Sequence, residues 1–108
     1  MAKYIATIQE GHAAENMKQE LEKSLKEIAY DSLGKFVTNS EVIWKVIPKG
    51  YGFTAGRLSN SSILLCVIPD EVEFKVRANF MQRLNELWVR QTGANSHELL
   101  IYTLGEAL

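Results

Sequence analysis

The stretch "SILLCVIP", from Ser62 to Pro69, restricts the possible folds more than any other part of the chain. Its central residues are all apolar, so a strand here presents apolar side chains to both faces of a sheet. Such runs are typical of strands that are buried on both sides. The chain has 108 residues, which is room for one domain with its own core. We therefore expect a sheet with helices on one face and further copies of the chain on the other.

The first half of the chain predicts a strand, a helix and a second strand. The first strand covers Tyr4–Ile8 and ends near Gln9. A helix is expected from Ala13, because apolar residues then recur at spacings of three and four. That apolar face consists of Met17, Leu21, Leu25, Ile28 and Ala29. "LG" ends the helix, with Gly34 free to take the left-handed conformation, and the next strand covers Glu41–Pro48.

The second half repeats this plan after a loop over 49–61, whose glycines and small polar residues predict no regular element. The strand at 62–69 leads to a helix with Asp70 as the predicted N-cap and Glu73 three residues on. The core stripe of this helix consists of Phe80, Leu84, Leu87 and Trp88. "TG" at 92–93 ends the helix, and a last strand follows at 97–104.

The two halves are interpreted as pseudo-repeated βαβ units, at about residues 2–48 and 62–104, within a single domain of residues 1–108. Each unit pairs its two strands in parallel through a right-handed crossover. The expected fold is therefore α/β (α+β), a four-stranded sheet with two helices on one face. The ferredoxin-like plan has the same element order and is the main alternative.

Composition limits the classes of function and location. Twelve basic and thirteen acidic residues give a net charge of -1, without the basic stripe of a nucleic-acid binder. The single cysteine, Cys66, has no internal disulfide partner, which fits a reducing, cytoplasmic compartment. No apolar run approaches the ~20 residues of a membrane span. Two histidines and one cysteine, far apart in sequence, predict no metal site, and no cofactor motif is present.

Several motifs together resemble a known family. They are "EG" at 10–11, "LG" at 33–34, "IPKGYGFTAG" at 47–56, "FMQRLNELW" at 80–88 and "TG" at 92–93. With them the chain resembles the tautomerase superfamily, of the 4-oxalocrotonate tautomerase and macrophage migration inhibitory factor type. The cis-3-chloroacrylic acid dehalogenase-like branch is the most similar. The resemblance covers nearly the whole chain and implies the family's fold and a homotrimer.

In that family the N-terminal proline is the general base or acid, and the residue after Met1 here is Ala2. The chemistry needs an amine whose pKa lies near the working pH. Removal of Met1 would leave Ala2 with a primary amine that can act as a base or form a Schiff base. If Met1 stays, Ala2 is only the first residue of a strand.

Four further residues are candidate substrate ligands by the resemblance, and each has a structural alternative. His12 lies where 4-oxalocrotonate tautomerase has a carboxylate-binding arginine, and its alternative is a solvated loop histidine. Lys35 matches the pocket lysine of macrophage migration inhibitory factor, or is a charge at a helix C-terminus. Arg57 follows "GFTAG", a loop near the family's pocket, or is a solvated loop residue. Tyr102, with Thr103 in competition, matches the last-strand tyrosine, or belongs to the core or an interface.

The dehalogenase's own chemistry is not expected. Ala29 lies at its catalytic histidine, Glu71 and Phe74 lie at its two substrate-clamping arginines, and the chain ends at Leu108, before the tail with its catalytic glutamate. The resemblance implies a weak keto–enol tautomerase or decarboxylase that acts on small keto or enol carboxylic acids. One alternative is a catalytically degenerate member that serves as a small-molecule-binding or oligomer subunit. Another, on the ferredoxin-like plan, is a dimeric small-molecule-binding module.

Overall fold

The computed structural model describes residues 2–34, 37 and 39–106. Its main elements are β1 (Ala2–Gln9), α1 (Lys18–Leu33), β2 (Ser40–Ile47), β3 (Phe53–Thr54), β4 (Arg57–Leu58), β5 (Ser62–Ile68), α2 (Phe74–Thr92) and β6 (Leu99–Gly105). Short 3₁₀ helices at Ala13–Asn16 and Ser96–Glu98 precede α1 and β6. The predicted order of strand, helix and strand, repeated once, is confirmed.

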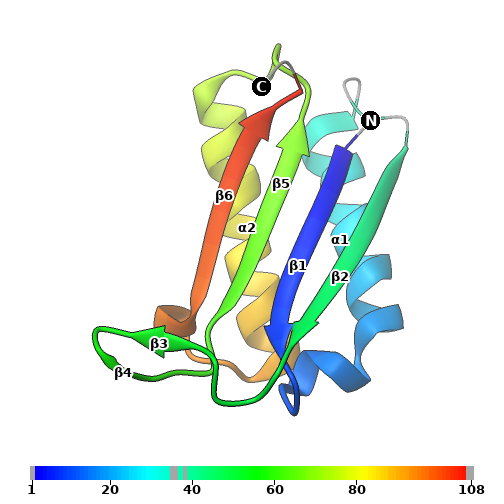
Figure 1. The fold of residues 1–108 in the computed structure, drawn as a ribbon. Helices are drawn as coiled ribbons and strands as arrows, with labels where there is room; N and C mark the ends of the chain where they lie inside the picture. Colours follow the sequence, from blue (N-terminus) through cyan, green and yellow to red (C-terminus); the bar gives the residue numbers. More distant parts are fainter. Residues whose placement is uncertain (1, 35–36, 38, 107–108) are drawn as a thin grey trace.

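The main sheet has the strand order β2-β1-β5-β6, with both helices on one face (Figure 1). β1 runs parallel to β2, with Ala2 opposite Ser40, and β5 runs parallel to β6, with Ser62 opposite Leu99. β1 and β5 are antiparallel. Both crossovers therefore join neighbouring strands, unlike the split βαβ units of a ferredoxin-like sheet. The predicted fold class is confirmed, and the start of β1 and the end of β6 lie at the same end of the sheet (Figure 1).

The core lies between the sheet and the two helices. Alternate residues of β1 and β5 point toward the helices and are buried, which follows from the period of two in a strand. The helical side of this core comprises Leu21, Leu25, Ala29 and Leu33 of α1 and Phe80, Leu84, Leu87 and Trp88 of α2. Both predicted apolar stripes are confirmed, with Met17 and Ile28 partly buried against the same cluster.

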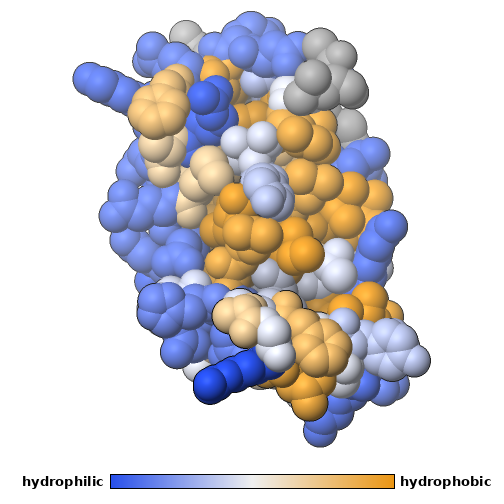
Figure 2. All heavy atoms as spheres, turned by 60° about the vertical axis from the view of Figure 1, so that its left-hand side comes forward, coloured by the Kyte–Doolittle hydropathy of each residue, from blue (hydrophilic) through white to orange (hydrophobic). Residues whose placement is uncertain are grey.

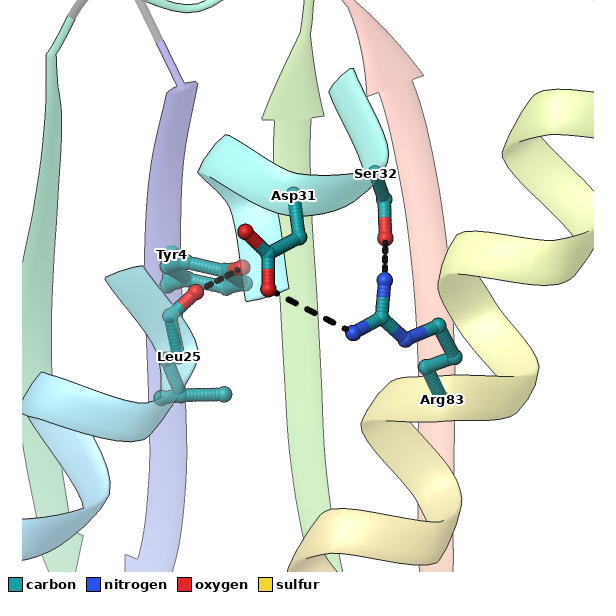
Figure 3. A network of polar contacts seen from close by, with 5 residues as sticks. All are labelled: Tyr4, Leu25, Asp31, Ser32 and Arg83. Atoms are coloured by element: carbon teal, nitrogen blue, oxygen red, sulfur yellow. Dashed lines mark hydrogen bonds and ion pairs between the residues drawn. The ribbon is translucent and has the colours of Figure 1, made fainter. Parts of the chain in front are cut away.

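Polar contacts tie the layers together (Figure 3). The buried Tyr4 hydroxyl donates a hydrogen bond to the Leu25 carbonyl oxygen at 2.8 Å, which joins β1 to α1. Arg83 of α2 contacts α1, with one guanidinium nitrogen donating to the Ser32 hydroxyl at 2.7 Å and another 3.7 Å from Asp31. Within the described residues neither helix has the length and apolar content that crossing a membrane requires.

The other face of the sheet carries apolar side chains, and no element of the described part of the chain covers it. Figure 2 shows apolar atoms gathered over the sheet and on the hairpin at its lower end. The large apolar side chains that are exposed on this face of β2, β5 and β6 are Ile43, Ile63, Leu100, Tyr102 and Leu104. We call this set the open sheet face.

Three local predictions are wrong. The loop at 49–61 contains a small antiparallel hairpin, in which Phe53 pairs with Leu58. The N-cap of α2 is Glu73 and not Asp70, because the chain turns between Pro69 and Val72 and is extended at Glu73. Gly34 ends α1 at a φ of -5°, outside the left-handed region. By contrast, Gly93 ends α2 at the predicted position and in the left-handed conformation, at a φ of 73°.

Candidate active site

Ala2 lies at the end of the sheet where β1 and β2 begin. Its side chain is buried, and its backbone nitrogen donates a hydrogen bond to the Asn39 carbonyl oxygen at 3.0 Å. A cavity of about 210 Å³ opens beside this contact and is lined by Lys26, Tyr30, Val37, Asn39 and Ser40. The nitrogen of Ala2 is therefore fixed in direction by Asn39, a residue that lines a small cavity.

Lys26 and Tyr30 bring an ammonium group and a phenol to this cavity from α1. They are four residues apart and so share one face of the helix. Tyr30 is 68% exposed, which leaves its hydroxyl accessible from solvent. Sequence reasoning missed both residues, because the helical period placed Lys26 on the solvent side. One signal in the sequence could have identified them. Lys26 and Tyr30 are four residues apart in the last turns of α1, and this end of the helix leads to the start of β2.

A second cavity, of about 290 Å³, flanks Ala2 on the β5 side and is lined by Ile68, Pro69, Asp70, Arg77, Thr103, Leu104 and Gly105. The antiparallel register sets Lys3 opposite Val67, so Ala2 comes next to Ile68. Arg77 donates to the Val72 carbonyl oxygen at 3.3 Å, and its guanidinium lies 5.6 Å from the centre of the Phe74 ring. Arg77 is thus the cation that lines this second cavity. It lies about one helical turn after the exposed Phe74, which the resemblance aligns with a substrate-clamping arginine of the dehalogenase.

His12 is buried at the opposite end of β1, so its interpretation as a solvated loop histidine is wrong. Its Nδ1 accepts a hydrogen bond from the Ala14 backbone N–H at 2.9 Å, and its Nε2 lies 3.2 Å from the Ser62 hydroxyl. Nδ1 is therefore the unprotonated nitrogen of a neutral ring, and Nε2–H donates to Ser62. Burial lowers the pKa of His12, against a smaller opposite effect of Glu98. Protonated His12, the predicted anion ligand, is disfavoured here.

Arg57 begins the short strand β4, where it pairs with Thr54 of β3. Its side chain is exposed, as are those of Tyr51, Phe53 and Leu58 around it. Figure 1 shows the hairpin projecting from the end of the sheet opposite to the start of β1. β1 has eight residues, so Arg57 and Ala2 are separated by about 23 Å along the strand direction.

The other candidates do not gather at Ala2. Tyr102 is 55% exposed on the open sheet face. Thr103 faces the helices, where its hydroxyl donates to the Met81 sulfur at 3.6 Å. Lys35 lies outside the described residues. One chain therefore connects Ala2 through Asn39 to the cavity of Lys26 and Tyr30, but separates it from His12 and Arg57.

Neither a cysteine nucleophile nor a metal site is indicated among the described residues. Cys66 is buried in β5, as predicted, and burial raises the pKa of its thiol to about 12. It is therefore a poor nucleophile at neutral pH. Within the described part of the chain, no group of three or more His, Cys, Asp or Glu side chains could hold a metal ion.

Solved structures share this fold. Native Ps01740 is similar with a TM-score of 0.86 at 20% identity, over 95% of this chain and 92% of that chain. The Q0 fused 4-OT wild type symmetric trimer gives 0.82 at 17% identity, over 95% and 84%. N1, a member of the cis-3-chloroacrylic acid dehalogenase family, gives 0.83 at 13% identity, over 95% and 73%. These similarities show that the chain has the tautomerase-superfamily fold, which confirms the predicted resemblance at the level of the fold.

Sequence comparisons add nothing to this result, since no protein-family model and no curated protein matches the chain.

Proposed function

We propose that the protein is a trimeric enzyme of tautomerase type, in which the α-amine of Ala2 acts on small keto or enol carboxylic acids after removal of Met1. The observation that carries this proposal is the hydrogen bond from the Ala2 nitrogen to the carbonyl of Asn39, a residue that lines one cavity with Lys26 and Tyr30. A cation, a phenol and an amine are the groups that a keto acid needs for binding and enolisation.

The proposed chemistry is a proton transfer at the carbon next to the keto group. A free α-amine has an ordinary pKa of about 7.7–8.0, so a useful fraction is unprotonated at neutral pH. One N–H of Ala2 stays on Asn39, which leaves the lone pair free to take the proton from carbon. Lys26 holds the substrate carboxylate, and the Tyr30 hydroxyl donates to the oxygen that becomes the enol. Delivery of that proton from the Ala2 ammonium to the enolate oxygen completes the tautomerisation and leaves the amine unprotonated again.

The open sheet face supports the trimeric part of the proposal. Apolar patches of this kind mark interfaces, and the fused 4-OT Q0 is a symmetric trimer. Ile63 lies on β5, one of the two central strands, so Ile63→Lys should yield monomers in sedimentation equilibrium at micromolar concentration, whereas the parent chain sediments as three copies. Lys23→Glu, on the solvent side of α1, is the control. A stable monomer or dimer of the parent chain refutes the trimer.

A trimer also gives Arg57 a role. The separation of about 23 Å between Arg57 and Ala2 excludes their meeting within one chain. We propose that the projecting hairpin supplies Arg57 to the Ala2 cavity of a neighbouring copy, where it is a second cation for the substrate carboxylate. Tyr102, on the open sheet face, then belongs to the interface between copies. The single buried thiol of Cys66 supports the cytoplasm as the location.

The experiment begins with intact mass spectrometry, which determines whether Met1 is removed. Protein without Met1 is incubated with pyruvate and cyanoborohydride, which reduces any imine, and the modified residue is mapped by peptide mass. We expect labelling at Ala2, slow enolisation of phenylpyruvate, and faster enolisation in Ala2→Pro because a secondary amine is the stronger base. The matched control is the same chain with Met1 retained.

Two ligand variants refine the test. In NMR titrations with pyruvate, Lys26→Ala should weaken binding and the neighbouring Lys23→Ala should not. If chain without Met1 is neither labelled at Ala2 nor active on phenylpyruvate, the enzyme proposal is rejected. Pyruvate binding without turnover would instead support a degenerate, ligand-binding member of the fold.

A further inference from the structure

The hairpin that carries Arg57 is attached to the sheet through one buried glutamine. Gln9, the last residue of β1, has only 3% of its surface exposed. Its Oε1 accepts a hydrogen bond from the Gly50 backbone N–H at 3.2 Å, before β3. Its Nε2 donates to the Ser59 carbonyl oxygen, after β4. A single side chain therefore bonds the backbone on both sides of the hairpin, and both ends of its amide are used.

Because Gly52 has no side chain, it leaves space for the side chain of Gln9. A Cβ atom on Gly52 would collide with Nε2 of Gln9 and would lie 2.8 Å from the Ser59 carbonyl oxygen. Both contacts are closer than any ordinary carbon contact, so the base of the hairpin closes on Gln9 only with glycine there. The Ser59 N–H also donates to the Gly52 carbonyl oxygen at 2.8 Å, which holds the two sides of the base together.

Another hydrogen bond holds the base of the hairpin from the β6 edge of the sheet. Glu98, just before β6, accepts a hydrogen bond from the Asn60 backbone N–H at 3.2 Å. The hairpin itself buries little, since Tyr51, Phe53 and Leu58 are 74%, 65% and 69% exposed. Its direction relative to the sheet is therefore set by its base.

We propose that Gln9 is a positioning residue for substrate binding, because it fixes the direction in which the hairpin presents Arg57 to the neighbouring copy. This inference rests on the proposed role of Arg57. Gln9 itself touches no substrate, since its side chain is buried and both ends of its amide are bonded to the base of the hairpin.

The test uses Gln9→Met, which keeps the length of the side chain and removes both hydrogen bonds. Gln19→Met on the exposed face of α1 is the matched control. Gly52→Ala is a second variant that displaces the same contact from the hairpin side and leaves β1 intact. Three quantities are measured: hydrogen exchange of the hairpin amides, the Kd for pyruvate by NMR titration, and the rate of imine trapping at saturating pyruvate.

We expect the Gly50 and Ser59 amides to exchange faster in Gln9→Met and Gly52→Ala than in the parent chain. In Gln19→Met they should exchange at the rate of the parent chain. The Kd for pyruvate should rise by up to about fivefold, to the level of Arg57→Ala, because one exposed cation contributes a small part of the binding. The trapping rate at saturation should stay unchanged. In the Arg57→Ala background, Gln9→Met should raise the Kd no further.

The double variant separates positioning from a merely structural role, since a general loss of packing would weaken binding in both backgrounds. An unchanged Kd in Gln9→Met, or equal losses with and without Arg57, overturns the inference while leaving the proposed function in place. A parent trimer that does not bind pyruvate overturns the proposed function and this inference with it.

Discussion

The buried His12 makes a defined prediction about the pH dependence of stability. The folded protein holds the ring neutral, with both nitrogens bonded and a pKa lowered by burial. In the unfolded chain the ring titrates near ~6.5. Between the lowered folded pKa and 6.5 the unfolded state therefore binds more protons, and stability falls as the pH falls. His12 contributes its full share above about pH 6.5.

The size of the effect follows from linkage. A single group changes the free energy of unfolding by at most about 1.4 kcal/mol per pH unit within that window. The groups that face the ring from other elements are Ser62 and Trp88, which are neutral, and Glu98, whose charge reduces the shift. We therefore expect a loss below about 1.4 kcal/mol between pH 6.5 and pH 5.5.

The assay is urea unfolding at half-unit steps from pH 8 to pH 5, at fixed protein concentration because an oligomer's stability depends on it. His12→Asn is the informative variant, since an asparagine oxygen can still accept the Ala14 N–H as a helix cap. It should be less stable at pH 8, by about 1–2 kcal/mol for the lost ring packing against Trp88, but should lose less stability toward pH 5. His97→Gln, at an exposed histidine, is the control. Equal slopes for the parent and His12→Asn would refute the reasoning.

Three further perturbations test single contacts. Tyr4→Phe removes the buried hydrogen bond to the Leu25 carbonyl and should lower the free energy of unfolding by about 1–2 kcal/mol in urea, while Tyr30→Phe should have little effect on stability. Ala55 has a φ of 52°, in a hairpin turn that favours glycine or asparagine, so Ala55→Gly should slow exchange of the hairpin amides, and faster exchange would contradict the turn geometry. Leu84→Ala opens a cavity in the core and should cost about 2–5 kcal/mol, and a cost below 1 kcal/mol would mean that α2 is not packed as described.

The fold was predictable because its main determinants are periodic. The spacing of Leu21 and Leu25 in one helix, and of Phe80 and Leu84 in the other, is dictated by a core on one side of a sheet. The apolar run of β5 likewise predicted that both faces of that strand avoid water. Such patterns average over many residues and tolerate exceptions.

The features that the sequence did not predict depend on single contacts, which the periodic pattern of apolar residues does not reveal. His12 looked solvated because it follows "EG" in a connection, yet Ser62 and Trp88 enclose it from two other elements. The hairpin escaped prediction because each of its strands has two residues and Ala55 lacks the usual turn chemistry. Lys26 was missed because the helical period marks the face toward the core and cannot reveal a cavity formed with the start of β2.

The position of the two chain ends has a consequence for engineering. Ala2 of β1 and Gly105 of β6 lie at the same end of the sheet with only β5 between them, a span of about 10 Å. A short linker can therefore join them, and new termini can open after α2 at the exposed Gly93, which leaves the hairpin that carries Arg57 intact. This circular permutant would retain every pairing of the main sheet, yet its Ala2 nitrogen would be an amide. It would keep the cavity but lack the α-amine. A comparison with the parent chain would therefore separate ligand binding by the cavity from catalysis by the amine.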